Sequence, residues 1–225
     1  MRRAAQLPLP WPRTQSTTRD DLVVAASNRL AVAAIEAWPN WPHPVLYVHG
    51  PEGSGKSHLA ASFVEATGAR SFEPGRFDPQ ARGFAIVLDD VDRERVPEAD
   101  LFALLNAARL GGGTVLLTAR DKPVDLAIRT PDLRSRINAA TVIPLGLPDD
   151  ELLAAVLAKH FSDRQIEFDP RLLSTVLPRV ERSLKAVQDL VERIDRETLA
   201  AGRRPTRRLV LDLLQDSGEK ARGPS

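Results

Sequence analysis

The sequence contains no cysteine, and this absence excludes several kinds of site. Without thiols, the chain has no disulfides, no thiolate metal ligands and no cysteine nucleophile. A reducing compartment is the simplest setting for such a protein, so we expect a cytoplasmic location. The sequence also lacks an uninterrupted apolar run of the ~18–20 residues that a membrane helix needs, and we therefore expect no membrane-spanning segment.

No charge of one sign dominates the composition. The 31 lysines and arginines nearly balance the 30 aspartates and glutamates, which gives a formal net charge of +1. Any role with nucleic acid therefore has to be local or indirect, because the chain lacks the global basic charge that coats a polyanion. Hydrophobic residues make up 43% of the 225 residues, enough for one large domain or for one medium and one small domain.

Residues 1–19 differ in composition from the rest of the chain. They contain four arginines and no acidic residue, a composition typical of targeting segments. Pro8, Pro10 and Pro12 nevertheless interrupt any targeting helix there, because each proline removes a backbone donor and fixes φ. We predict a flexible tail at 1–19 and a second, disordered tail at 217–225.

Residues 20–147 alternate strand-like and helical patterns. Four short, nearly continuous apolar runs at 44–50, 84–90, 114–120 and 141–145 are typical of parallel strands covered on both faces. Helix end signals lie before and between these runs: Ser27 as the cap of a helix at 28–38, Pro97 before a helix at 98–110, and Gly111 after it. The pattern predicts an α/β domain with a parallel sheet flanked by helices.

Beyond Pro148 the periodicity becomes helical only. Apolar stripes at 152–161, 184–194 and 209–214 predict a small all-α domain over 148–216. We place a hinge near Leu145–Pro148, between the two domains.

The segment GPEGSGKS at 50–57 fits the pattern G-x-x-x-x-G-K-[ST], directly after one predicted strand and before a helix. Its glycines allow successive backbone N–H groups to face inward and form an anion nest at a helix start. In a phosphate loop, Lys56 reaches the β- and γ-phosphates and the Ser57 hydroxyl binds Mg²⁺. The predicted cofactors are ADP or ATP with Mg²⁺, and the predicted nucleotide ligands in this segment are Gly50, Pro51, Glu52, Gly53, Ser54, Gly55, Lys56 and Ser57.

The apolar run at 84–90 ends in two acids. Asp89 lies where its carboxylate would hold the water shell of Mg²⁺. Asp90 occupies the place of a water-orienting glutamate and is one methylene shorter, which predicts slow hydrolysis and a weak ATPase at most. An apolar strand followed by aspartate is also common in proteins without such a site.

The chain resembles the AAA+ ATPases, the P-loop NTPases with a helical lid domain, across residues 20–215. Within them it most resembles the family of the replication initiator DnaA and its shorter homologue Hda. The segment 20–34 is similar to the family's adenine-pocket pattern, with Ala25 in place of a glycine. The resemblance implies that Val23, Val24 and Asn28 border the adenine, although a capped amphipathic helix also explains this pattern.

The resemblance assigns further roles. Thr118 stands at the family's sensor 1 position near the γ-phosphate, although it is also an ordinary buried strand-end threonine. The segment PDLRSRI at 131–137 resembles Box VII, which implies that Arg136 is an arginine finger for a neighbouring subunit's nucleotide. Arg134 lies on a different helical face and is the less favoured finger; a solvated surface arginine is the alternative for both. The family's sensor 2 arginine corresponds to Lys185 or, one turn earlier, to Arg182, and two solvated basic residues remain the alternative.

We expect two DNA-binding parts of DnaA to be missing. Only 32 residues separate Lys56 from Asp89, too few for the extra DnaA helices that grip single-stranded DNA. After residue 215 only a short polar stretch follows, so we expect no helix-turn-helix and no direct sequence-specific DNA binding.

The start of the chain instead resembles the sliding-clamp-binding motif found at the start of Hda. An extended peptide could fill an apolar groove with its leucines and tryptophan while the glutamine amide anchors one end. The implied clamp-binding residues are Gln6, Leu7, Leu9, Pro10 and Trp11. A Pro-rich disordered leader is the alternative.

The resemblance implies a regulator that binds the DNA polymerase sliding clamp and DnaA. It would present Arg136 to DnaA-bound ATP, stimulate hydrolysis and so prevent re-initiation of DNA replication. Whether it forms a homodimer stays open. Two alternatives remain: an autonomous AAA+ ATPase of the helicase-loader type, and a non-catalytic adaptor in which the nucleotide only stabilises the fold.

Overall fold

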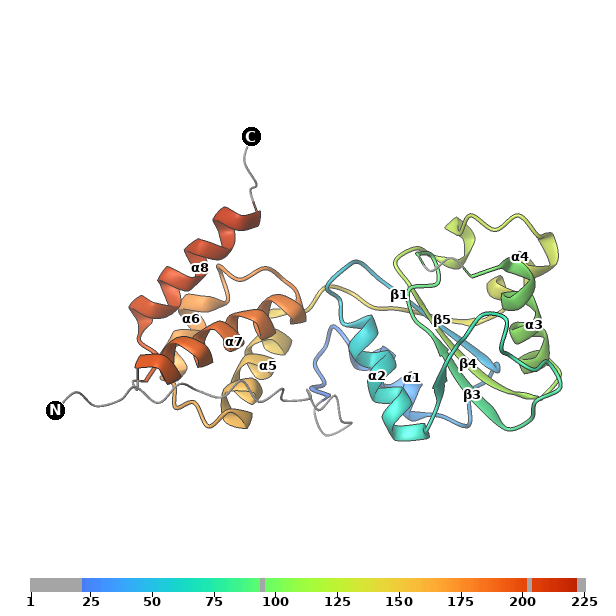
Figure 1. Cartoon of the computed structure of the whole chain (residues 1–225), viewed down its shortest axis with the longest axis horizontal. Helices are drawn as coiled ribbons and strands as arrows, with labels where there is room; N and C mark the ends of the chain where they lie inside the picture. The colour runs from blue at the N-terminus through green and yellow to red at the C-terminus, as the bar shows by residue number, and fades with distance from the viewer. Residues whose placement is uncertain (1–21, 94–95, 202–203, 222–225) are drawn as a thin grey trace. The chain divides into compact units, whose positions relative to one another are not determined.

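The computed structural model describes residues 22–93, 96–201 and 204–221. By its contacts the chain divides into two compact units (Figure 1). An α/β unit contains the described residues up to Val156 together with Arg182–Lys185. A helical unit contains Leu157–Glu181 and the described residues from Ala186 onward. The division falls later than the predicted boundary at residue 148.

Five parallel strands form one sheet within the described residues, in the order β2–β3–β4–β1–β5. Four of them confirm the predicted strands. The remaining strand, β2, has only two residues, so no periodicity in the sequence can reveal it. The strands are β1 (Val45–His49), β2 (Arg70–Ser71), β3 (Phe84–Leu88), β4 (Gly113–Ala119) and β5 (Thr141–Pro144).

Helices cover both faces of the sheet (Figure 1). Helices α1 (Arg29–Glu36) and α2 (Lys56–Thr67) pack on one face, and α3 (Glu98–Arg109) and α4 (Pro131–Asn138) pack on the other. A short 3₁₀ turn, η2 (Pro123–Asp125), precedes α4. This two-sided cover explains why the strands are apolar in nearly every position: successive side chains enter opposite cores.

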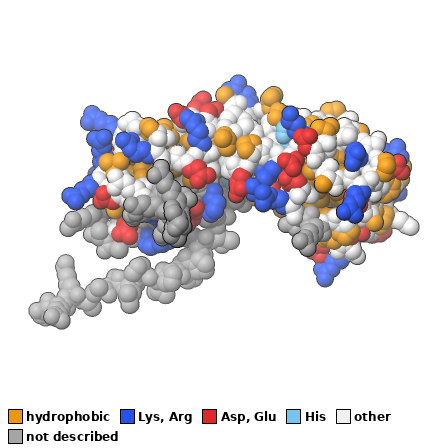
Figure 2. All heavy atoms as spheres, turned by 90° about the horizontal axis from the view of Figure 1, so that it is seen from above, with side chains coloured by type: hydrophobic (Ala, Val, Ile, Leu, Met, Phe, Trp, Pro, Cys, Tyr) orange, Lys and Arg blue, Asp and Glu red, His pale blue; other side chains and the backbone are white. Residues whose placement is uncertain are grey.

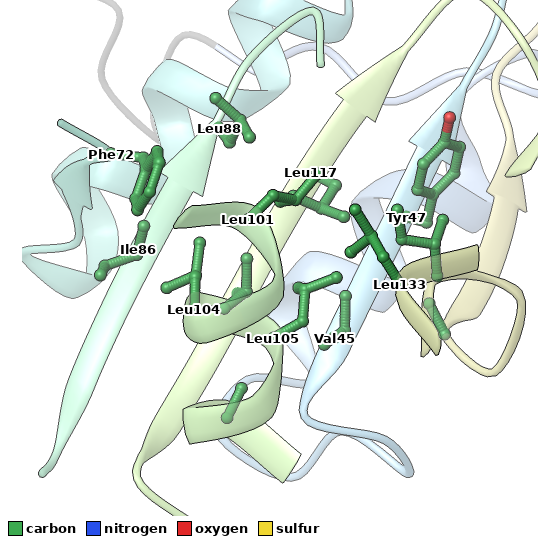
Figure 3. Packing of buried hydrophobic residues seen from close by; sticks show 14 of the residues in the cluster. Val45, Tyr47, Phe72, Ile86, Leu88, Leu101, Leu104, Leu105, Leu117 and Leu133 are labelled. Atoms are coloured by element: carbon green, nitrogen blue, oxygen red, sulfur yellow. The ribbon is translucent and has the colours of Figure 1, made fainter. Parts of the chain in front are cut away.

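The core beneath α3 is built from leucines of the helix and alternate side chains of the strands. Figure 3 shows Leu101, Leu104 and Leu105 of α3 beside Val45 and Leu117 of the sheet. Leu104 is 0% exposed, as expected for a side chain at the centre of such a layer.

The opposite core contains an aromatic group. The Phe63 ring of α2 stacks on Trp41, with ring centroids 5.3 Å apart, and meets Trp38 edge-on at 6.1 Å. Both indoles also donate hydrogen bonds, so their polar atoms are satisfied.

The predicted ends of α3 are confirmed, but the predicted cap of α1 is wrong. Pro97 precedes α3, and Gly111 follows it with φ of +81°, a conformation that suits glycine. Helix α1 begins at Arg29, after Asn28. Ser27 makes no cap because its hydroxyl accepts a hydrogen bond from the backbone N–H of Asp149, at 3.4 Å.

The three longest of the remaining helices follow the predicted apolar stripes, whereas η3 and α6 match no predicted stripe. Helix α8 continues past residue 216, where the sequence predicts a tail. Phe161, Val187, Val191, Ile194 and Val210 are each at most 1% exposed. The elements are α5 (Asp150–Asp163), η3 (Pro170–Leu172), α6 (Leu173–Val176), α7 (Leu184–Ala201) and α8 (Arg207–Ala221).

Basic and acidic side chains are interspersed on the face that Figure 2 shows, in line with the balanced composition. None of the helices in the described part of the chain combines the length and apolar character that crossing a membrane requires.

Candidate functional site

The turn between β1 and α2 is shaped by glycine. Gly53 and Gly55 have φ of +78° and +99°, in the left-handed region that other residues rarely adopt. Gly50 lies very close to Leu145, the residue that follows the edge strand β5. A Cβ placed on Gly50 would be 2.0 Å from the Leu145 carbonyl oxygen. The 50–57 sequence therefore forms a tight loop that leads directly into a helix start.

Lys56 folds back into this loop. Its ammonium donates hydrogen bonds to the carbonyl oxygens of Gly50, at 2.8 Å, and Pro51, at 3.0 Å, and the residue is only 5% exposed. Burial lowers the pKa of Lys56, and the nearby Asp90 carboxylate offsets part of that effect. A bound phosphate group would give this cation an anionic partner.

The other loop residues differ in exposure. The Ser54 hydroxyl is buried without a hydrogen-bond partner, whereas Ser57, the predicted Mg²⁺ ligand, is exposed at the start of α2. Pro51 and Glu52 are also exposed. The Lys56 ammonium and the backbone N–H groups of the glycine loop are the donors that a phosphate loop offers to an anion.

The sheet order brings the predicted acids and the sensor 1 threonine to the same edge, because β3, β4 and β1 are neighbours. Thr118 is 0% exposed; its hydroxyl donates a hydrogen bond to Asp89 and accepts one from the backbone N–H of Asp90, at 2.9 Å. Asp90 has a left-handed backbone, with φ of +50°. Burial raises the pKa of Asp90, and the adjacent Asp89 adds to the rise.

Sequence reasoning missed Arg120, which follows β4. Its guanidinium forms an ion pair with Glu52 of the phosphate loop. Its backbone N–H donates to the Asp92 carboxylate at 3.0 Å. The position of Arg120, at the end of the predicted strand 114–120, was the available signal, since the ends of parallel strands meet at one edge.

The predicted adenine segment is a closed turn. The Asn28 amide, 8% exposed, donates to the Val23 carbonyl at 2.7 Å and accepts from the Ala25 N–H at 2.8 Å. Val23 is half-buried and Val24 is 51% exposed. The turn thus presents an apolar side chain outward.

Residues 182–185 contact the phosphate loop. Ser183 lies against Gly53, and the backbone N–H of Leu184 donates to the Gly53 carbonyl at 3.4 Å. Of the two predicted sensor 2 residues, Arg182 donates to Asp150 at 2.8 Å and Lys185 is exposed. The Arg182–Asp150 pair is itself solvent-exposed, and such pairs contribute little stability.

Arg136, the predicted finger, lies on α4 and is half-buried. Its guanidinium carbon is 4.5 Å from the centroid of the Phe102 ring on α3, and its Nε is buried without a hydrogen-bond partner. Arg134 is exposed and donates a hydrogen bond to the Ile128 carbonyl. Arg136 therefore rests on α3 rather than in the phosphate loop.

The predicted clamp-binding residues lie outside the described part of the chain. They are Gln6, Leu7, Leu9, Pro10 and Trp11.

Comparison with solved structures identifies the fold. The chain matches domain III of the replication initiation protein DnaA from Thermotoga maritima with a TM-score of 0.76 at 20% identity, covering 92% of this chain and 98% of that one. It matches the RuvB Holliday junction branch migration motor of the same organism with a TM-score of 0.66 at 18% identity, covering 88% and 71%. The chain has the AAA+ P-loop fold. The parallel sheet with flanking helices confirms the predicted fold class.

Sequence comparison leads in the same direction. No family model matches the chain. An uncharacterized protein of Haemophilus influenzae is 24% identical over 218 residues, which cover 89% of this chain and 94% of that protein. DnaA 2 of Protochlamydia amoebophila is 25% identical over 213 residues, 80% of this chain and 47% of the relative. The AAA+ chain thus spans less than half the length of the curated DnaA relatives it matches.

The close approach of Gly50 and Leu145 predicts a steep cost for a side chain at this glycine. We expect Gly50→Ala to lower the free energy of unfolding by about 1–3 kcal/mol, because the backbone carbonyl it meets cannot move cheaply. Gly146→Ala is the matched control, since nothing lies within 4 Å of a Cβ there. Urea unfolding measures both; equal stabilities of the two variants would contradict the proposed packing.

The raised pKa of Asp90 predicts that its charge destabilises the ligand-free fold. Asp90→Asn keeps the shape and tolerates the left-handed backbone, so we expect a higher free energy of unfolding at neutral pH. The wild type loses stability as pH rises from the ordinary aspartate range, about pH 4, through the raised pKa. The advantage of the variant should therefore vanish below that range. Urea unfolding across pH tests this; a less stable variant at neutral pH would contradict it.

Proposed function

We propose that this chain is an Hda-like member of the DnaA family, which binds an adenine nucleotide and stimulates hydrolysis of ATP on DnaA. The observation that carries the proposal is the buried Lys56 in a glycine loop beside Asp89 and Thr118, within a fold like DnaA domain III. The low-identity DnaA relatives support the same family. A solved DnaA structure that contains AMPPCP and single-stranded DNA supports nucleotide binding by this fold.

The residues present fit a nucleotide. The loop offers Lys56, the buried Ser54 hydroxyl and backbone N–H groups to phosphates, and the turn at 22–28 offers apolar surface to a base. Ser57 and Asp89 would hold Mg²⁺ together with the phosphates, which is how this ion is usually bound. Mg²⁺ would supply charge neutralisation at the phosphate oxygens.

Asp90 governs hydrolysis by the chain itself. Its carboxylate is one methylene shorter than that of a glutamate, and its backbone is held in a left-handed conformation. A base that is poorly placed for water makes the chain a weak ATPase at most. The bound nucleotide, ADP or ATP, then serves mainly to order the site.

Arg136 acts on the ATP of DnaA. In that hydrolysis, water attacks the γ-phosphorus and the bond to the leaving ADP oxygen breaks, while negative charge spreads over the phosphoryl oxygens. A planar guanidinium that stays protonated suits that charge and contributes ~10³–10⁵ in rate in comparable systems. The Phe102 ring supports Arg136 without neutralising it, which leaves the charge available to a partner.

The segment Gln6–Trp11 would attach the chain to the DNA-loaded sliding clamp. Such attachment raises the local concentration near DnaA even where the direct contact is weak. The protein would then work in the cytoplasm, at the nucleoid.

The decisive experiment measures the turnover of DnaA-bound ATP in the presence of loaded clamp. We expect Arg136→Ala to lower the stimulated rate by about 10³-fold or more, because the transition-state charge loses its partner. Arg134→Ala is the matched control, two residues away on the same helix, and it should stay close to the wild type. An Arg136→Ala variant as active as the wild type would refute the proposal.

Two further measurements, turnover without DnaA and the partner effects of Lys56→Ala, separate the alternatives. Substantial turnover by the chain alone would favour an autonomous ATPase. Partner effects that persist in Lys56→Ala, with only a lower melting temperature, would favour a non-catalytic adaptor.

A further inference from the structure

The Asp149 carboxylate joins two segments that lie 122 residues apart in sequence. One oxygen accepts a hydrogen bond from the Leu152 N–H at 2.7 Å and so caps the start of α5. The other oxygen accepts from the Ser27 N–H at 3.0 Å, and the Asp149 N–H donates back to the Ser27 hydroxyl at 3.4 Å.

The charge of Asp149 is well supported. The hydrogen bond from Leu152, followed by those from Ser27, holds the pKa of this carboxyl below its usual range. Both oxygens are occupied by backbone donors. An aspartate can serve two such donors, whereas serine has only one side-chain oxygen.

On one side, Asp149 fixes a small rigid body. The turn at 22–28 is closed internally by Asn28, and Ala25 at its centre is 3% exposed. Because Ser27 belongs to this turn, its bond to Asp149 anchors one end of the turn, beside the burial of Ala25.

On the other side, Asp149 belongs to a stretch that runs beside the phosphate loop. The Leu145 N–H donates to the His49 carbonyl at 2.7 Å, and the Leu145 carbonyl lies where a side chain on Gly50 would be. Arg182 also contacts this stretch, through the Pro148 carbonyl at 3.4 Å and the exposed Asp150 carboxylate at 2.8 Å. Asp149 thus links the turn at 22–28 to the chain that touches the phosphate loop.

We propose that Asp149 is a positioning residue for the nucleotide base. It ties the turn at 22–28, which presents Val24 outward, to the stretch whose Leu145 carbonyl lies against Gly50 of the phosphate loop. The inference rests on the proposed function, since it requires an adenine nucleotide in the loop. The proposal assigns to Asp149 an effect on the binding of the base, with no effect on the binding of the phosphates.

Asp149→Ser separates the two roles of this side chain. Serine is a good helix cap, so it keeps the bond to Leu152, but its single oxygen cannot also serve Ser27. Asp169→Ser is the matched control: Asp169 caps η3 in the helical unit by accepting from the Arg171 N–H at 2.9 Å. Thermal unfolding establishes that each variant is folded.

The test is a calorimetric titration with two ligands, MgADP and inorganic tripolyphosphate, which contacts the phosphate loop without a base. We expect Asp149→Ser to weaken MgADP binding by about tenfold, the effect of one lost charge-assisted hydrogen bond. Tripolyphosphate binding should not change. Asp169→Ser should bind both ligands like the wild type.

Two results would overturn this inference alone: wild-type affinity of Asp149→Ser for MgADP, or an equal loss of affinity for both ligands. Absence of MgADP binding by the wild type would overturn the proposed function and this inference with it. Should Asp149→Ser fail to fold, Asp149→Asn replaces it, since an amide also offers only one acceptor oxygen. The same two ligands then decide.

Discussion

The site depends on the hydrogen bonds that the buried ammonium of Lys56 donates within its loop. Within the described part of the chain, this ammonium donates hydrogen bonds to two carbonyl oxygens of its own loop. Carbonyls solvate a cation only in part, and the depressed pKa of Lys56 shows that its burial is incompletely compensated. The loop holds this arrangement because glycine permits both its left-handed turns and its contact with Leu145.

The sheet order then decides what surrounds the cation. Placing β4 between β1 and β3 brings Asp89 and Asp90 to the same edge as the loop, with Thr118 bonded to both. Arg120 adds a second positive charge, paired with Glu52. The edge therefore combines two cations with a group of carboxylates, so an anionic ligand with a divalent cation would satisfy charges of both signs.

Local patterns in the sequence predict much of this arrangement. The strands, the phosphate loop and the two acids all lie in contiguous segments whose composition reflects their structure. The structural role of Ser27 could not be predicted in this way. Its residue type indicates a helix cap, but Ser27 instead forms hydrogen bonds with Asp149, far along the chain. The aromatic support of Arg136 and the pairing of Arg120 likewise arise from contacts between elements, which leave no periodicity in the sequence.

Nucleotide affinity of the intact chain tests the central claim most directly. Calorimetric titration with MgATP and MgADP should show saturable binding to the wild type and to Lys122→Ala, a change at an exposed lysine beyond β4. Lys56→Ala should lose most of that affinity, because the phosphates lose the one cation that the loop buries for them. Equal binding by Lys56→Ala and the wild type, or no binding by either, would contradict the account.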